Sequence, residues 1–370
     1  MPEAVWGTEE GHISDRSDSM FLLIAILIFS FLIFVHELGH FLTAKLFDVK
    51  VNEFSIFMGP KLLHWGKGET EYSVRLLPIG GFCAMEGEDG SSDDPRAFTA
   101  KAPWKRIIIL AAGAAMNFLT GLVILVVLYS TATGFRTLEI TGFLENCPLE
   151  GTLQVGDVVE EINGDNLYLF SDFSMLTERA GEGSMDLTVR RDGERVVLRN
   201  VNMVKQEYTV DGEAMYLFGI SFGATEEKTV AAVLKNAWWT AVDFGRMVKI
   251  GLLDLITGKA GLQDMSGPVG IVDTIQQTGK SSETTADGIL NVVYFGAFIA
   301  VNLAFMNMLP IPALDGGHIF LLLVTWIIES VTKRRINPKY EAYIHAAGMV
   351  LLLGFMFVVT ANDIFKLVTG

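Results

Sequence analysis

The chain has 370 residues, half of them hydrophobic, and a formal net charge of −15. Its mean hydropathy of +0.39 is too apolar for an ordinary soluble protein, and its acidic balance argues against a nucleic-acid partner, which requires a basic surface. Two cysteines, Cys83 and Cys147, are too few for a disulfide framework. The composition therefore predicts a membrane protein.

Residues 1–19 are acidic, with five carboxylates against one arginine. They lack the basic start and the small-residue cleavage site of a secretory signal. We expect either a disordered extension or a start that is assigned too early, with Met20 as the natural one.

Four apolar stretches approach the length that a helix needs to cross a bilayer. They are about Met20 to Phe47, Ile107 to Thr133, a stretch from about Ile289 that is broken around Pro310 and Pro312, and Ala342 to Thr360. Backbone polar groups inside a bilayer must be paired within each span. An all-helical membrane domain is therefore expected.

The first stretch contains a cluster of ionisable side chains, His36, Glu37 and His40. On a helix the two histidines lie on one face and can share one Zn²⁺, while Glu37 can accept a proton from water. Ionisable groups in a transmembrane segment are costly and usually mark function. The cluster predicts a zinc hydrolase, with polar helix packing as the structural alternative.

Residues 48–104 form the first long polar segment. A possible β-hairpin has arms at Val51–Met58 and Glu71–Leu77, with glycine and proline between them as turn residues. The apolar stretch 76–82 is interrupted by proline and glycine. It can dip into the bilayer beside the metal helix where protein or water shields its backbone.

Residues 134–225 alternate short apolar strands with turn residues, and a helix is expected at Leu169–Ala180. Residues 226–288 contain an amphipathic helix, about Val230–Thr257, followed by a Gly-Pro bend. Its aromatic and basic side chains suit a membrane interface or the core of the soluble domain.

A hydrolytic zinc site needs three protein ligands and an open position, so two histidines are insufficient. Asp315 is the candidate third ligand, because it follows the proline break of the third span. Helix capping is its structural alternative. His318 is expected to support the site or the structure rather than to bind the metal, and His345 is not expected to be a ligand. Asn117, inside the second span, either packs helices together or supports the site.

The helical His36-Glu-Leu-Gly-His40, the distant Leu314-Asp315-Gly316, the Asn-x-x-Pro-x-Pro segment and the inserted β-rich domain together resemble the site-2 protease family. The likeness extends over residues 20–370 and is greatest to the bacterial PDZ-containing RseP/RasP type. It implies an intramembrane zinc metalloprotease with one Zn²⁺ per chain. His36, His40 and Asp315 would be the zinc ligands, Glu37 the catalytic base, and Asn307 a contact to substrate backbone.

The resemblance also implies the partners. The 53–82 region corresponds to the family's membrane-associated hairpin, which adds a strand to an unwound substrate. The implied contact residues are Phe54, Ser55, Ile56, Gly59, Gly80 and Gly81. The implied substrates are single-span membrane proteins already cut by another protease, such as an anti-sigma factor or a signal-peptide remnant. The lipid bilayer is the other partner, and no nucleic acid is expected.

The expected fold class is an α-helical polytopic membrane protein of about four transmembrane helices, the third one broken, with a membrane-associated β-hairpin and an inserted PDZ-like α+β domain. The expected order is an acidic extension (1–19), a membrane part (20–133) containing the hairpin segment (48–104), the PDZ-like domain (134–225), an interfacial segment (226–288) and a second membrane part (289–370).

The basic connection at 331–341 should be cytoplasmic, which places the PDZ-like domain outside a bacterial cell membrane and the active site in the bilayer nearer the cytoplasmic side. Two alternatives remain. A catalytically inactive scaffold acting through its PDZ-like domain predicts a missing ligand or base, and all four residues are present. An ion transporter predicts an internal repeat, and none is visible in the sequence.

Overall fold

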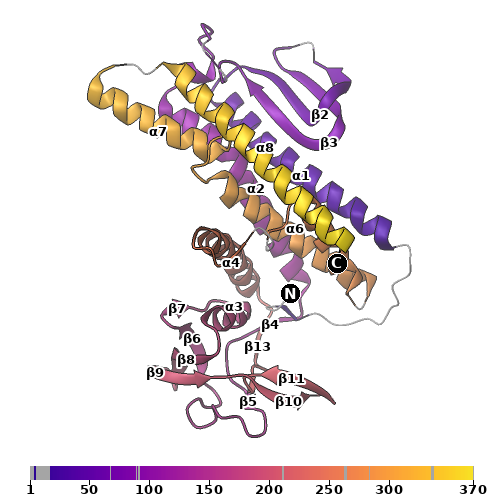
Figure 1. Cartoon of the computed structure of the whole chain (residues 1–370), viewed down its shortest axis with the longest axis vertical. Helices are drawn as coiled ribbons and strands as arrows, with labels where there is room; N and C mark the ends of the chain where they lie inside the picture. The colour runs from indigo at the N-terminus through magenta and orange to yellow at the C-terminus, as the bar shows by residue number, and fades with distance from the viewer. Residues whose placement is uncertain are drawn as a thin grey trace. The chain divides into compact units, whose positions relative to one another are not determined.

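The structure of the chain is a computed structural model (Figure 1). It describes residues 4–5, 17–66, 68–88, 90, 92–210, 212–261, 265–282, 284–334 and 337–369. The chain divides into two compact units, one formed by Met1–Glu9 and Leu125–Asp243, the other by Glu10–Ile124 and Phe244–Gly370. The expectation for residues 1–19 lies outside the described residues, except at 4–5 and 17–19.

The second unit is built mainly from helices. They are α1 (Ser17–Leu46), most of α2 (Pro103–Thr131), the end of α4 (Val230–Ile256), α5 (Pro268–Lys280), α6 (Thr285–Asn307), α7 (Asp315–Thr332) and α8 (Pro338–Thr369). Large apolar side chains remain exposed along α1 and α8, for example Leu27, Val350 and Phe357. Such exposure suits helices whose outer faces contact lipid.

Five helices among the described residues are long and apolar enough to cross a membrane: Met20–Leu46, Pro103–Thr131, Thr285–Asn307, Asp315–Thr332 and Tyr340–Lys366. The sequence predicted about four spans with a broken third one. The difference arises at Pro310 and Pro312, where the chain leaves α6 and starts α7 as a separate helix. Each of the two pieces is long enough to be a candidate span by itself.

A small β-sheet packs against α1 in the same unit (Figure 1). It is formed by β2 (Val51–Trp65) and β3 (Glu71–Met85), both longer than the predicted arms. Residues 53–56 pair with 81–84 and also with 71–74, and residues 61–65 pair with 72–75. Residues 81–84 therefore form an edge of this sheet. A short 3₁₀ helix, Phe98–Ala100, follows before α2.

The first unit contains an α+β domain, which is the part predicted to be soluble. Its main sheet has the strand order β7-β6-β8-β9. The strands and the helix are β1 (Ala4–Val5), β4 (Gly134–Arg136), β5 (Gly142–Phe143), β6 (Val158–Ile162), β7 (Asp165–Asn166), α3 (Phe170–Ala180), β8 (Gly183–Arg191), β9 (Glu194–Met203), β10 (Gln206–Val210), β11 (Glu213–Leu217), β12 (Ile220–Ser221) and β13 (Thr225–Glu227). A single apolar core lies among these strands and α3.

The soluble domain also contains a buried carboxylate. Asp157 is 1% exposed and accepts two hydrogen bonds from Arg191, each 2.8 Å long. The Gln154 backbone N–H donates a third, at 2.9 Å. Burial opposes ionisation, but these donors outweigh it and hold the pKa of Asp157 below its usual value. The ion pair joins the turn before β6 to the end of β8.

Candidate metal centre

The two histidines of the first span lie on one face of α1. Their rings meet edge to face, with centroids 4.8 Å apart and planes inclined by 83°. The Nε2 atoms of His36 and His40 are 3.2 Å apart. The spacing of one helical turn therefore brings both imidazole nitrogens to the same point, as the sequence predicted.

Asp315, almost 300 residues later in the chain, reaches the same point. Its Oδ2 atom lies 3.2 Å from Nε2 of His36 and 3.5 Å from Nε2 of His40. This oxygen is buried and accepts no hydrogen bond of good geometry. The three atoms, two imidazole nitrogens and this oxygen, thus form a nearly equilateral triangle.

The triangle has the size that zinc requires. In a tetrahedral zinc site with bonds of 2.0–2.1 Å, ligand atoms are separated by about 3.3 Å. The three observed separations, 3.2, 3.2 and 3.5 Å, lie close to that value. Two imidazoles and one carboxylate are also a donor set that zinc takes in hydrolytic enzymes. The residues present therefore fit this metal.

Helix α2 orients both imidazoles. The Nδ1–H group of His40 donates to the backbone carbonyl of Ile109 at 2.8 Å. Since a carbonyl can only accept, this bond fixes the tautomer of His40 and leaves its Nε2 lone pair directed at the centre. One turn further along α2, a Cβ atom at Gly113 would lie 2.4 Å from Nε2 of His40. Only glycine leaves room for the imidazoles there.

A second turn along the same face of α2 brings Asn117 against His36. Its Nδ2 atom is 3.4 Å from Nδ1 of His36, and Asn117 is 1% exposed. Its Oδ1 atom is buried and accepts no hydrogen bond. Turning the amide by 180° would place Oδ1 beside His36 Nδ1, where it could accept the proton that a metal-binding imidazole carries on that nitrogen.

The connection between α6 and α7 presents Asp315. Ala313 has a φ of +78°, a left-handed conformation that costs an alanine roughly 1–2 kcal/mol. A Cβ atom at Gly316 would lie 2.3 Å from the Met308 carbonyl oxygen, and one at Gly317 would lie 2.1 Å from that of Ile311. The chain can make this tight reversal because two glycines follow the aspartate.

The capping alternative for Asp315 fails on geometry. Leu314 occupies the N-cap position of α7, and Asp315 is the first helical residue. Its Oδ2 atom faces the histidines rather than the backbone N–H groups of its own helix. Asn307 ends α6 with its Nδ2 atom 3.5 Å from Nδ1 of His36. Both residues that flank the connection therefore reach the histidine pair.

Glu37 is half-buried beside the edge strand of the small sheet. A Cβ atom at Gly81 would lie 3.4 Å from Glu37 Cγ and 3.0 Å from the Ser55 carbonyl oxygen. The backbone of residues 81–84 therefore passes next to the carboxylate that follows His36. Of the residues expected to contact substrate, Gly81 is the one the structure places against Glu37.

The other expected contact residues lie within the small sheet. Phe54 and Ser55 are buried, Phe54 against the ring of Phe41 at 5.1 Å and Ser55 with its hydroxyl accepting from Ser73 at 2.9 Å. Ile56 pairs with Gly81. Gly59 and Gly80 adopt positive φ angles of +88° and +80° at the Met58 end of the sheet. Phe54 thus packs against α1, and Ser55 is held by the neighbouring segment of β3.

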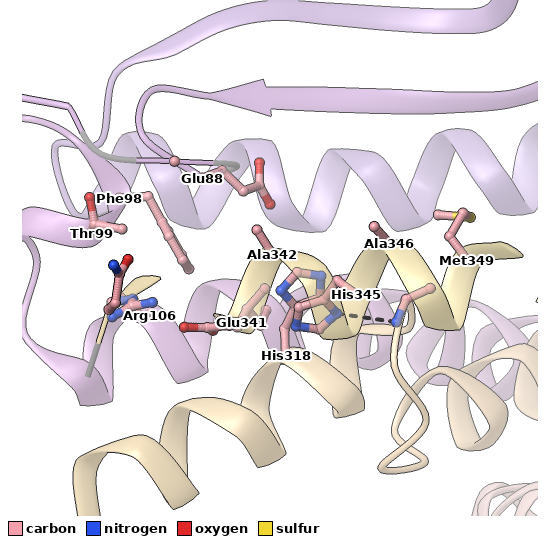
Figure 2. Close-up of a pocket in the computed structure, with 14 residues that line it drawn as sticks. Glu88, Phe98, Thr99, Arg106, His318, Glu341, Ala342, His345, Ala346 and Met349 are labelled. Carbon is pink, nitrogen blue, oxygen red and sulfur yellow. Dashed lines mark hydrogen bonds between the residues drawn. The ribbon is translucent and has the colours of Figure 1, made fainter. Parts of the chain in front are cut away.

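A second group of possible ligands, His318, Glu341 and His345, lines a pocket of about 610 Å³ (Figure 2). The two imidazoles are stacked, with centroids 3.5 Å apart and planes within 9°. Imidazole lone pairs lie in the ring plane, so two parallel rings cannot direct them at one ion. This arrangement lacks the convergence seen at His36, His40 and Asp315.

The sequence matches peptidase family M50 over residues 24–355. The chain belongs to peptidase family M50. A Clostridium perfringens protein with a provisional zinc metalloprotease name is 37% identical over 347 residues, which cover 93% of this chain and 98% of that protein. The regulator of sigma-W protease RasP of Bacillus subtilis is 31% identical over 435 residues, covering 92% and 97%. The expectation of a zinc metalloprotease of the site-2 type is thereby confirmed.

At the centre of this M50 peptidase, sequence reasoning missed Ile109 and Gly113, and it named Asn117 without deciding between helix packing and support of the site. Ile109 contacts His40 through its backbone carbonyl, so the identity of its side chain gives no indication of the contact. Gly113 and Asn117 are four residues apart in an otherwise apolar helix, the same spacing as His36 and His40. That match of spacings was a usable indication that α2 lies along the histidine face.

Proposed function

We propose that this M50 peptidase hydrolyses peptide bonds inside the membrane segments of single-span proteins. His36, His40 and Asp315 hold one zinc ion, and Glu37 is the general base. The observation that carries the proposal is the convergence of three donor atoms, 3.2–3.5 Å apart, from α1 and from the junction of α6 and α7. Helices α1, α6 and α7 are all apolar enough to lie in a bilayer.

The position of the histidines along α1 supports a site below the lipid surface. His40 and His36 precede the end of this span, Leu46, by six and ten residues. At 1.5 Å per residue, the centre lies roughly 9–15 Å from that end. The basic connection at 331–341 favours the cytoplasm as the side on which α7 ends and α8 begins. The junction of α6 and α7 lies at the histidines, inside the membrane, so we count these two helices together as one crossing. With that count the domain at 134–225 faces outward, and the sheet of β2 and β3 is cytoplasmic.

When bound, zinc polarises the scissile carbonyl and makes a water molecule acidic enough to be deprotonated near neutral pH. The side chains and backbone of the protein transfer the proton, orient the metal ligands and hold the substrate. Glu37 accepts the proton from that water and delivers it to the leaving amine. Ile109 fixes the tautomer of His40, and Asn117, with its amide turned so that Oδ1 faces His36, accepts from Nδ1–H of that ring. Asn307, at the end of α6, contacts the substrate backbone.

A transmembrane substrate must unwind before it is cut, because a helix hides its carbonyls in internal hydrogen bonds. The edge formed by residues 81–84 can replace those bonds by strand addition. Gly81 has no side chain to hold the new strand away from Glu37. In this arrangement Phe54, Ser55 and Ile56 shape the sheet, and Gly59 and Gly80 set its turns.

The domain at 134–225 acts as a PDZ-like size filter that excludes substrates with bulky outer parts. Its support is a small α+β fold with one four-stranded sheet and the helix α3. Removal of residues 138–222 should raise cleavage of intact substrates relative to substrates already cut by another protease. Equal selectivity before and after the deletion would contradict the filter.

The main test compares the wild type with Glu37→Gln in proteoliposomes that contain single-span substrates. We expect cuts inside the apolar segment by the wild type, mapped by mass spectrometry. The variant should keep zinc but lose activity by about 10²–10⁴-fold. Metal analysis should give one zinc per chain, lost in His36→Ala and in Asp315→Ala. A wild type without zinc or cleavage would favour an inactive scaffold, and ion flux in its place would favour a transporter.

A further inference from the structure

Helix α8 contacts the connection that carries Asp315 on both sides of that residue. Before it, the backbone N–H of Ala313 donates to Nδ1 of His345 at 3.2 Å. After it, the ring of His318 stacks on the ring of His345, with centroids 3.5 Å apart. Figure 2 shows the stacked pair and the dashed hydrogen bond. One side chain of α8 therefore touches the chain two residues before and three residues after the aspartate.

The same face of α8 limits the connection sterically. Gly348, one turn beyond His345, faces Pro312, and a Cβ atom there would lie 2.3 Å from Pro312 Cβ. The connection is thus in close contact with α8 and cannot move toward it. Ala313 meanwhile keeps a disfavoured left-handed conformation, with a φ of +78°. An interaction must hold this residue in that conformation, and the hydrogen bond from its backbone N–H to His345 can do so.

We propose that His345 is a positioning residue for the metal centre. By accepting the Ala313 N–H, it keeps the connection between α6 and α7 in the conformation that directs Asp315 at His36 and His40. The inference rests on the proposed role of Asp315 as a zinc ligand. It assigns His345 no contact with metal or substrate.

The expected defect is specific to one ligand. His40 is held by α1 and by the Ile109 carbonyl of α2. His36 is held by α1 and by Asn117 of α2, with Asn307 at the end of α6 also beside its Nδ1 atom. Replacing His345 by leucine removes the acceptor and leaves a backbone donor without a partner, which is costly when the group is shielded from water. Asp315 would then be free to turn away while the histidine pair stays in place.

Asparagine is the matched replacement. Its Oδ1 atom stands two bonds from Cβ, as Nδ1 does in histidine, so it can accept the same N–H. The adjacent pocket of about 610 Å³ already borders His345, so a smaller side chain enlarges an existing space rather than creating a sealed cavity. His345→Asn and His345→Leu therefore differ mainly in whether Ala313 keeps an acceptor.

The experiment uses the full chain in detergent and measures zinc affinity by competition with a chelator, together with kcat and KM at saturating zinc. We expect His345→Leu to bind zinc about 10–100-fold more weakly, as is typical when the support of a metal ligand is lost. His345→Asn should stay near the wild type. His318→Phe, which keeps a ring for stacking, is the control and should also bind zinc normally.

Two results would overturn the inference: wild-type zinc affinity in His345→Leu, or an equally large loss in His345→Asn and His345→Leu. A different result would show that the proposed zinc-ligand role of Asp315 is itself wrong. If Asp315→Ala binds zinc as tightly as the wild type, the aspartate is not a ligand, whatever the His345 variants do. A general loss of stability is recognised because it would lower the melting temperature of all three variants alike.

Discussion

Gly113 of α2 lies directly against His40 of α1, so close that a Cβ atom at position 113 would sit 2.4 Å from the imidazole Nε2. The same atom would lie 2.7 Å from Cε1 of His36. The absence of one methyl group thus leaves space for the rings of both His36 and His40. Helix α2 thus contributes to the centre through the missing side chain of Gly113, the backbone carbonyl of Ile109 and the side-chain amide of Asn117.

Gly113→Ala should therefore abolish zinc binding without unfolding the protein. Alanine is the better helix former, so α2 itself gains about 1 kcal/mol, while the methyl group displaces the imidazoles from their converging positions. The measurement is zinc content after dialysis, beside the melting temperature. Gly354→Ala is the control, because that glycine of α8 has open space around it. One zinc per chain in Gly113→Ala would show that the rings can shift without penalty.

Asn117 should be replaceable by aspartate but not by leucine. A carboxylate can accept the Nδ1–H of His36, whereas leucine can only fill the space. We expect about a 10–100-fold loss of zinc affinity in Asn117→Leu and little change in Asn117→Asp. Chelator competition measures both. If leucine is tolerated, Asn117 serves helix packing alone.

The sequence predicted those features of the metal centre that depend only on residues close together in the chain. His36, Glu37 and His40 are set by the helical period, and Asp315 by the proline break that precedes it, so both could be anticipated. The sequence also anticipated a helix from Val230, which the structure ends at Ile256. Each of these depends on a short stretch of chain and on simple stereochemistry.

The features that were missed depend on contacts between distant segments. Ile109 and Ala313 act through backbone groups, which every residue has, so their identity carries no information. The small sheet is longer than predicted because residues 53–56 pair on both sides, and only the fold decides such pairing. The prolines marked a break in the third span but not whether one helix or two would result.

A side chain at position 81 should impair cleavage while sparing the metal. Valine suits a strand, but its branches would fill the space between the edge strand and Glu37, where a Cβ atom alone comes to 3.4 Å. We expect Gly81→Val to cut about 10–100-fold more slowly, since small misplacements at a reacting centre have effects of this size. Its zinc content should match the wild type.

The matched control for this prediction is Gly68→Val. Gly68 lies between β2 and β3 and has nothing within 4 Å of its would-be Cβ. Its substitution should leave cleavage unchanged. Full activity in Gly81→Val would mean that substrate does not approach Glu37 along residues 81–84.

Asp157 should make the stability of the soluble domain depend on acid pH. Its pKa is lowered in the folded domain by Arg191 and by the Gln154 N–H, so its ionised form favours folding. That contribution is complete above the unfolded pKa, about 3.9, and is lost as the pH falls through the lower folded value. Asp157→Asn should therefore cost about 1.5–3 kcal/mol at neutral pH.

Hydrogen exchange of β6, β8 and β9 in the full chain, followed by mass spectrometry, measures this local stability. The variant should exchange faster than the wild type at pH 6. The difference should begin to shrink below about pH 4, where the unfolded chain takes up the proton, and should be lost once the pH falls through the lower pKa of the folded carboxyl. Arg191→Met removes the partner and should be worse than Asp157→Asn, because it leaves a buried carboxylate uncompensated. A difference that stays constant down to acid pH would mean that Asp157 stabilises the domain by packing rather than by charge.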